Sequence, residues 1–179
     1  EKDVFLMPLA SDTGLGPNCE VIPTNKPFFI KVGYKLLGRV LNGLGQPIDN
    51  LESIDNLLDW PIHRQSPAPY TRKPTKDAIS LGIRAIDGFL TVAKGQRIGL
   101  FAGSGVGKSS LMGQIVRNSE SPIVVVCLLG ERGREVMDFV NETLGEHGLK
   151  KSVIIAATSD EPSLVRYTSA YVRSEEHTS

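Results

Sequence analysis

A glycine-rich loop followed by lysine and serine holds the first residues of this chain that could do chemistry. The stretch 96–110 reads QRIGLFAGSGVGKSS and fits the pattern G-x-x-x-x-G-K-[ST], except that Ala102 replaces the first glycine. Glycines lack a Cβ, so successive backbone N–H groups can turn inward and form an anion nest. Lys108 would reach the β- and γ-phosphates of a nucleotide, and the Ser109 hydroxyl would bind Mg²⁺. The predicted nucleotide-binding residues are Gly103, Ser104, Gly105, Val106, Gly107, Lys108, Ser109 and Ser110.

The alternative interpretation of this loop is a glycine-rich turn that binds nothing. The context favours phosphate binding, because a predicted apolar strand over residues 98–102 precedes the loop and a predicted helix over 108–117 follows it. The positive end of that helix would add to the attraction for an anion. Alanine is the smallest replacement for glycine, so we expect Ala102 to do little harm.

A second group of charged residues, GERGRE over 130–135, follows the apolar run IVVVCLL. Ligands of an open parallel sheet lie beyond the carboxyl ends of its strands, so Glu131 and Arg132 should face the phosphates. A carboxylate there can deprotonate the attacking water, and an arginine can neutralise the transferred phosphoryl group. Glu135 could hold the metal through water. We predict Glu131, Arg132 and Lys108 as catalytic residues, and Ser109 and Glu135 as metal-binding residues. The alternative is a solvated helix start with internal ion pairs.

These residues need a framework that places them together, and the chain from residue 78 onward supplies an alternation of strands and helices. Strands are predicted at 98–102, 123–129 and 153–157, with helices at 108–117, at 135–144 and from residue 162. Gly145 is predicted to stop the second helix. Alternating strands and helices are typical of an α/β fold with a mainly parallel sheet.

The first part of the chain has a different pattern. Short apolar runs at 4–9, 19–22 and 28–32 predict strands of a small β domain. Residues 36–49 hold three glycines and a proline and mark the exit from that domain, whereas 51–60 are only weakly amphipathic. Prolines between 61 and 74 then predict an extended connection, because proline is excluded from regular helices and central strands.

The composition is that of an ordinary globular domain without a charge bias. The 179 residues are 40% hydrophobic and 22% charged, with 20 basic and 20 acidic side chains, so nothing global attracts nucleic acid or an acidic membrane. Cys19 and Cys127 have neither metal-ligand spacing nor a disulfide framework, which is typical of a reducing cytosol. No signal peptide opens the chain, and its longest apolar run is too short to cross a bilayer.

The residues around these motifs resemble the hexameric export ATPases, meaning the flagellar and type III secretion ATPases, which are relatives of the rotary ATP synthases. The likeness is carried by GIRAIDGFLTVAKGQRIGLFAGSGVGKSSL, LLGERGREVMDFV and LGRVLNGLGQPID, and it covers nearly all of residues 4–172. It implies a RecA-like P-loop NTPase core preceded by the remnant of an N-terminal β-barrel domain. The implied divisions are barrel remnant 1–35, junction and linker 36–77, and nucleotide-binding domain 78–172.

The same resemblance implies roles for individual residues. Lys108 becomes the phosphate lysine, Ser109 the Mg²⁺ ligand and Glu131 the general base. Arg132 becomes a γ-phosphate contact, and Glu135 holds the metal through water. ATP and Mg²⁺ are the implied cofactors. The implied protein is a cytoplasmic homohexamer, peripheral at the inner-membrane export apparatus. Its implied partners are stalk and stator proteins and chaperone–substrate complexes, without nucleic acid.

Three alternatives stay open from the sequence. One is a catalytic subunit of a rotary ATP synthase, and another is a ring-shaped, RecA-like or terminator-like nucleic-acid motor. The latter needs a basic track with aromatic side chains, whereas aromatics here are 6% of the chain. The third is a fragment that binds nucleotide weakly and turns over little, because the Walker B acid and a neighbouring subunit's arginine, which the resemblance implies for a family chain more than twice as long, are missing. We interpret residues 173–179, RSEEHTS, as a translated sequencing adapter, with the natural chain continuing past Val172.

Overall fold

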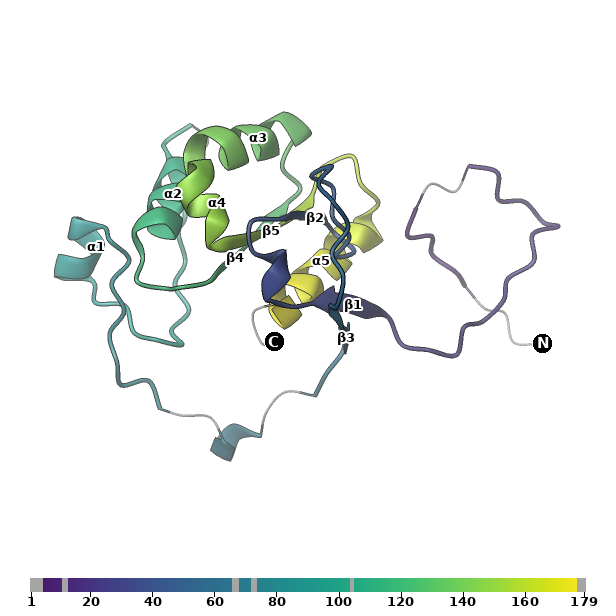
Figure 1. Ribbon diagram of the computed structural model, residues 1–179, viewed down its shortest axis with the longest axis horizontal. Coiled ribbons are helices and arrows are strands. Elements are labelled where there is room, and N and C mark those ends of the chain that lie inside the picture. Colours follow the sequence, from purple (N-terminus) through teal and green to yellow (C-terminus); the bar gives the residue numbers. More distant parts are fainter. Residues whose placement is uncertain (1–4, 11–12, 66–67, 72–73, 104, 177–179) are drawn as a thin grey trace.

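A computed structural model describes residues 5–10, 13–65, 68–71, 74–103 and 105–176 (Figure 1). Within these ranges the strands are β1 (Phe29–Val32), β2 (Val40–Asn42), β3 (Leu58–Pro61), β4 (Val124–Leu129) and β5 (Ser152–Ala157). The α-helices are α1 (Arg84–Phe89), α2 (Lys108–Asn118), α3 (Gly133–Asp138), α4 (Gly145–Lys150) and α5 (Ser163–Glu176). A π-helical segment, Phe139–Leu144, joins α3 to α4, and 3₁₀ turns occupy Tyr34–Leu36 and Pro69–Thr71.

A parallel sheet with the strand order β2-β5-β4 forms the centre of the molecule. β5 lies between its two neighbours, with Ile154 opposite both Val40 and Val126, and all six of its residues are buried. The predicted strands at 123–129 and 153–157 are confirmed, as is the α/β fold with a parallel sheet. Long apolar runs suit such strands because helices cover both faces of the sheet.

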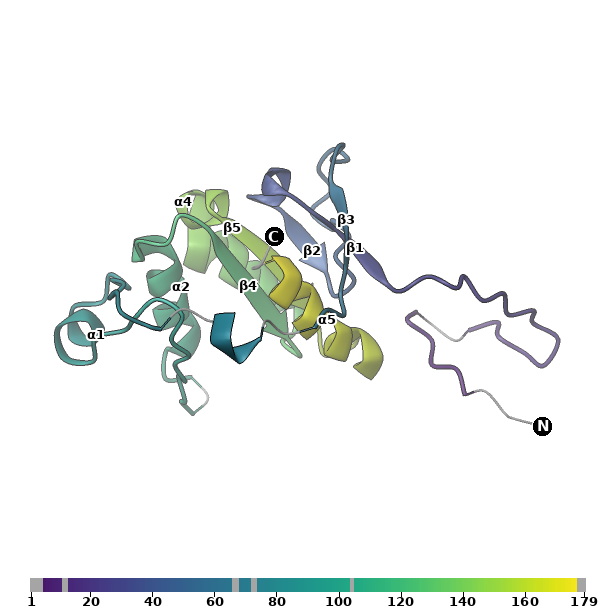
Figure 2. The same cartoon turned by 90° about the horizontal axis from the view of Figure 1, so that it is seen from below.

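Successive side chains of β4 and β5 enter opposite cores. Val126, Leu128, Ile154 and Ala156 pack with residues of α2, α3 and the π-helical segment. Val153 and Ile155 pack on the other face with Val172 of α5 and with the antiparallel pair of strands β1 and β3. Figure 2 shows α2 and α4 on one side of the sheet and α5 on the other. This layering brings the start of α2 and the end of β4 to a common edge.

The predicted strand at 98–102 is wrong for this structure. The segment leading into the loop is assigned no strand, and Ile98, Leu100 and Phe101 are 52%, 41% and 95% exposed. A strand requires a hydrogen-bonded neighbour, and β4 is an edge strand whose recorded pairing is with β5 alone in the part of the chain described. The apolar pattern therefore identified a segment suited to a sheet, but none of the strands formed by the described residues pairs with it.

Two other local predictions need correction. The helix predicted over 135–144 begins at Gly133 and becomes π-helical from Phe139, and Gly145, with φ of +60°, ends that segment but also starts α4. The strands predicted at 4–9 and 19–22 are not formed by the described residues, where Phe5 and Ile22 are 94% and 75% exposed. Of the three strands predicted in this part of the chain, the one at 28–32 is confirmed as β1, which pairs with β3.

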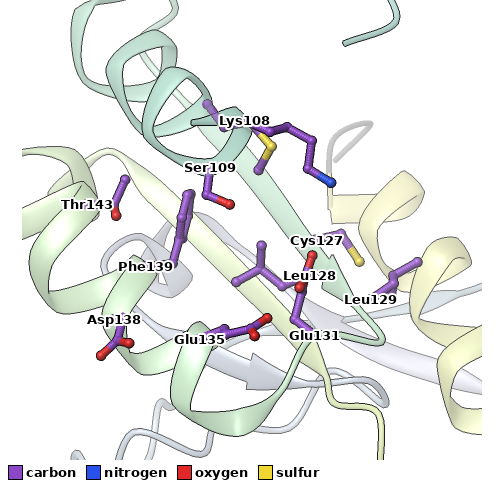
Figure 3. A pocket seen from close by; sticks show the side chains of 11 residues that line it. Lys108, Ser109, Cys127, Leu128, Leu129, Glu131, Glu135, Asp138, Phe139 and Thr143 are labelled. Atoms are coloured by element: carbon purple, nitrogen blue, oxygen red, sulfur yellow. The ribbon is translucent and has the colours of Figure 1, made fainter. Parts of the chain in front are cut away.

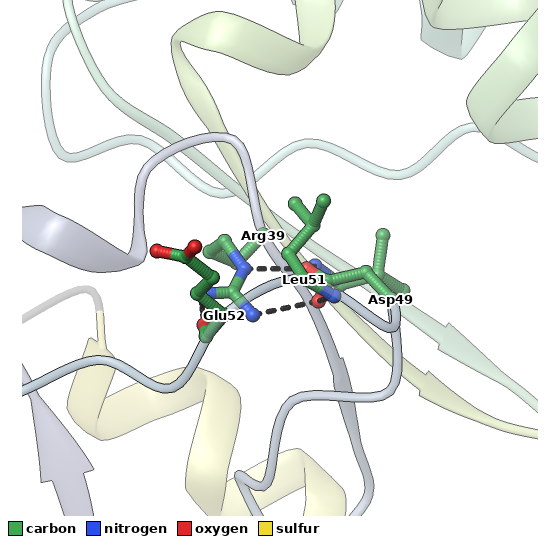
Figure 4. A network of polar contacts seen from close by, with 5 residues as sticks. Arg39, Asp49, Leu51 and Glu52 are labelled. Carbon is green, nitrogen blue, oxygen red and sulfur yellow. Dashed lines mark hydrogen bonds and ion pairs between the residues drawn. The ribbon is translucent and has the colours of Figure 1, made fainter.

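A buried ion pair anchors β2, which comes from the segment interpreted as a junction (Figure 4). Arg39 donates hydrogen bonds from Nε and Nη2 to the two Asp49 carboxylate oxygens, each 2.6 Å long. Asp49 also accepts the backbone N–H groups of Val40 and Leu51 at 3.1 and 3.2 Å. Hydrogen bonding from Arg39 is the main cause that lowers the pKa of Asp49 to about 2. The pair thus joins the turn after β2 to the start of that strand.

The predicted helix after Pro162 is confirmed as α5, which continues through residues 173–176, whereas 177–179 lie outside the described residues. Across the ranges described, no helix combines the length and the apolar character that a membrane span requires.

Candidate functional site

The glycine-rich loop meets α2 in a backbone conformation that requires glycine. Gly105 and Gly107 have φ angles of +76° and +93°, in the left-handed region that side chains other than glycine rarely adopt. Added Cβ atoms at these positions would meet nothing within 4 Å, so the requirement comes from the backbone and not from crowding. Gly107 precedes α2 without a side-chain hydrogen bond capping the helix. The first-turn N–H groups of α2 therefore face the loop as donors for an anion.

A cavity of about 550 Å³ brings together most of the residues predicted from the sequence. Its lining joins the loop and the start of α2 to the two acids after β4. The lining residues are Ala102, Gly103, Gly105, Gly107, Lys108, Ser109, Ser110, Glu131 and Glu135. Val106 is 68% exposed and is not part of this lining, and Ser104 lies outside the described residues.

An adjoining cavity of about 450 Å³ extends from the same residues toward the helical layer. Lys108, Ser109, Glu131 and Glu135 line both spaces, and the second also has walls from β4 and the π-helical segment, including Cys127 and Phe139. In Figure 3, Ser109, Glu131 and Glu135 project into one space between α2 and α3. Burial raises the pKa of the Cys127 thiol to about 11, and its Sγ donates to the Ser169 carbonyl at 3.6 Å.

Glu131 is held in place by the backbone around it. Gly130, with φ of +70°, turns the chain at the end of β4, and its N–H donates to the Ala157 carbonyl at 2.8 Å. The Glu131 carbonyl accepts the Ser159 N–H at 3.0 Å. The loops after β4 and β5 are thus tied together, and the carboxylate lies at the carboxyl edge of the sheet, where ligands of such sheets bind.

Arg132 is not brought into either cavity. It precedes α3, its side chain is 82% exposed, and its Nη1 lies 3.5 Å from the Glu135 carboxylate. Arg134 and Asp138 form a further surface pair at 3.8 Å. The two neighbouring residues therefore differ. Glu131 lines the cavity, whereas Arg132 forms the kind of ion pair within the charged stretch that the alternative interpretation predicts.

Arg166 of α5 is a candidate that the sequence reasoning missed. Its Nε is buried and has no hydrogen-bond partner among the residues that the structure describes, and its Nη1 lies 4.0 Å from the position that a Cβ on Gly130 would occupy. A buried guanidinium nitrogen without a hydrogen-bond acceptor is costly, and an anion at this edge of the sheet could supply one. The signal that could have found it is its place near the start of the helix predicted from residue 162, which follows a predicted parallel strand and so begins at the same sheet edge as the phosphate loop.

The chemistry of these donors fits a nucleoside triphosphate with Mg²⁺. Inward backbone N–H groups and the Lys108 ammonium match phosphate oxygens. Mg²⁺ is usually held by few protein oxygens, together with water and substrate phosphates, and the Ser109 hydroxyl and a carboxylate supply such oxygens. Glu131 and Glu135 are acceptors on the opposite wall of the same cavity.

Comparisons with known proteins agree with this chemistry. Residues 82–174, more than half of the chain, match the model of the ATP synthase alpha/beta family, nucleotide-binding domain. The chain is 43% identical over 171 residues to the flagellum-specific ATP synthase of Bacillus subtilis, covering 96% of this chain and 39% of that protein. It is 43% identical over 168 residues to the type 3 secretion system ATPase of Xanthomonas euvesicatoria, covering 94% and 38% respectively.

Solved structures give the same result. A prototypical ATPase from the type III secretion system of pathogenic bacteria matches with a TM-score of 0.79 and 41% identity, covering 83% of this chain and 43% of that chain. The ATPase EscN of enteropathogenic E. coli, assembled in complex with its central stalk EscO, matches at 0.77 and 42% identity, covering 83% and 37%. The resemblance to export ATPases is confirmed, although the chain spans about two fifths of the length of these curated relatives. The chain belongs to the ATP synthase alpha/beta family.

Proposed function

We propose that this chain forms the phosphate-binding half of an ATPase site, in a protein that energises export through a flagellar or type III secretion apparatus. The observation that carries the proposal is a single cavity lined by Lys108, Ser109 and Glu131 at the carboxyl edge of a parallel sheet. Similarity to flagellar and type III secretion ATPases over most of the chain supports export as the purpose of hydrolysis.

Each residue has a task in this proposal. Loop N–H groups and the Lys108 ammonium bind and orient the phosphates, and the Ser109 hydroxyl holds the cation. When bound, MgATP supplies the phosphoanhydride bond and a divalent charge that neutralises the phosphates. Glu131 orients a water molecule and accepts its proton. The Arg166 guanidinium neutralises negative charge at the same edge, and Glu135 orients the cation through water.

The assembly and surroundings are also proposals. Because EscN is described as an assembled ATPase with a central stalk, we propose a homohexamer that binds a stalk protein. Stator proteins and chaperone–substrate complexes are the further partners that we propose, at the cytoplasmic side of the inner-membrane export apparatus. Formal charge balance, with 20 basic and 20 acidic residues, supports a function without nucleic acid.

The test is MgATP binding by the chain itself, measured with a fluorescent ATP analogue. Lys108→Ala should weaken binding at least about tenfold, because charge-assisted hydrogen bonds to phosphate are lost. Lys94→Ala is the matched control, since it removes the same charge at an exposed position outside both cavities. Equal affinity in the Lys108 and Lys94 variants would contradict the proposed site.

A further inference from the structure

Gly113 lies at the closest approach between α2 and the helical layer beside it. It is buried in α2, and a Cβ added there would overlap the Cγ2 atom of Thr143 and lie 3.1 Å from the Thr143 carbonyl oxygen. Side chains and backbone of the π-helical segment therefore occupy the space that any residue other than glycine would need. A second glycine acts similarly nearby, because a Cβ on Gly148 of α4 would lie 3.1 Å from Cγ of Arg117 in α2.

This contact forms one wall of the candidate site. Thr143 and Phe139 line the same cavity as Lys108 and Ser109, and Figure 3 shows them on the π-helical segment opposite Ser109. The π-helical segment continues directly from α3, which carries Glu135. Any increase in the spacing between α2 and this layer would therefore move the phosphate-binding side chains away from the carboxylates.

Glycine at position 113 does not stabilise the helix in which it lies. Glycine in a helix interior is less favourable than alanine, because it loses more backbone freedom on folding. Gly113 lies within α2 and does not have the positive φ of Gly105 and Gly107, so no left-handed backbone angle requires glycine there. The remaining requirement is the close approach to Thr143. π-Helical segments, such as the one that receives this contact, frequently occur at functional sites.

We propose that Gly113 is a positioning residue of the candidate site: it sets the spacing between α2 and the π-helical segment, and so the geometry of Lys108 and Ser109 relative to Glu131 and Glu135. The expected effect of Gly113 on nucleotide binding rests on the proposed function. The spacing itself can be measured without nucleotide.

The first test is a double-mutant cycle on MgATP affinity, read with the fluorescent analogue. Gly113→Ala should weaken binding about tenfold, because a core forced to accept an extra methyl group shifts its backbone. In the Thr143→Ser background, which removes Cγ2, the same substitution should have a much smaller effect. Gly88→Ala is the matched control, since Gly88 lies in α1 with nothing within 4 Å of an added Cβ, and it should leave affinity unchanged.

The second test reads the spacing directly, through a thiol introduced at Met112, which lies on α2, lines this cavity and packs on the same side of the sheet as the π-helical segment. In a background with Cys19→Ser, Cys127→Ser and Met112→Cys, which replaces both natural cysteines, labelling of the introduced thiol by a maleimide without nucleotide reports access to the cavity. Gly113→Ala should accelerate labelling several-fold, and adding Thr143→Ser should reverse most of that increase. If wild type binds no MgATP, the proposed function fails, whereas these labelling rates still decide the spacing proposal.

Other results of these two tests would contradict the proposed role of Gly113. The proposal is overturned if Gly113→Ala changes the labelling rate and the affinity no more than Gly88→Ala does. It is also overturned if Gly113→Ala has the same effect in the wild-type and Thr143→Ser backgrounds. If Gly113→Ala alone does not fold, the proposal requires the double variant to fold and bind. A double variant as impaired as the single variant would contradict it.

Discussion

Adjacent residues of the charged stretch have opposite surroundings in this structure. Glu131 lies just past the end of β4, where hydrogen bonds to the loop after β5 hold its backbone, and it lines the cavity. Arg132 is the next residue, but it precedes α3 and pairs on the surface with Glu135. Spacing alone cannot separate such neighbours, because the direction of each side chain depends on where the strand ends and the helix begins.

The Arg39–Asp49 pair gives a prediction about pH at the residue level. The pKa of Asp49 is lowered to about 2 in the folded chain, below the value of about 3.9 expected when unfolded. A carboxyl group whose pKa is lowered on folding stabilises the fold at pH values above its unfolded pKa. That stabilisation is lost as the pH falls through its folded pKa. Asp49→Asn should therefore reduce the free energy of unfolding by about 3 kcal/mol at pH 7, because Arg39 is left buried without its partner.

Urea unfolding from pH 7 down to pH 2 would measure this effect. The difference between wild type and Asp49→Asn should be constant above about pH 5 and shrink between about pH 4 and 2. Asp59→Asn is a control, since Asp59 pairs with Lys31 at 2.8 Å but is 63% exposed, and exposed pairs contribute little. A difference that does not change with pH would show that Asp49 is not the titrating group.

At the level of elements, sequence patterns were most reliable where a segment is long, apolar and covered on both faces. β4, β5 and α2 were predicted to within two residues of their observed ends. The same kind of pattern failed at 98–102, 4–9 and 19–22, because apolar alternation does not say which strand is available as a partner. The π-helical segment was also missed, since its residues keep a spacing compatible with an ordinary helix.

The unpaired segment before the loop should be visible in hydrogen exchange. Amides of residues 98–102 should exchange orders of magnitude faster than those of β5, because the latter form ladder hydrogen bonds in a buried strand. Peptide-resolved exchange followed by mass spectrometry would measure both in one experiment. Protection of 98–102 equal to that of β5 would mean that this segment is paired in solution, contrary to the structure.

The whole molecule matches the family model over more than half of its length, and it spans about two fifths of the length of its curated relatives. The parallel sheet and the phosphate loop could be anticipated from sequence, because both depend on local patterns. The position of Arg166 and the close approach at Gly113 could not, because each depends on contacts between segments far apart along the chain. Domain boundaries at residues 35, 77 and 172 stay predictions.

Nucleotide binding should stabilise the whole fold. A ligand that binds only the folded state adds about 2.7 kcal/mol at one hundred times its Kd. For a chain of this size that free energy should raise Tm by roughly 5–10 °C. Thermal unfolding with and without saturating MgATP measures the shift, and Lys108→Ala should abolish most of it. A shift that is the same in Lys108→Ala would indicate that the nucleotide binds elsewhere.

The central claim is that the glycine-rich loop and Glu131 face one bound triphosphate. An experimental structure of the chain with Mg²⁺ and a non-hydrolysable ATP analogue tests it most directly. The measured quantity is the position of the Glu131 carboxylate relative to the terminal phosphate. We predict phosphates held by the loop and Lys108, with the carboxylate facing the terminal phosphate across the space of one water molecule. Phosphates bound away from Lys108, or a Glu131 side chain directed out of the cavity, would contradict the account.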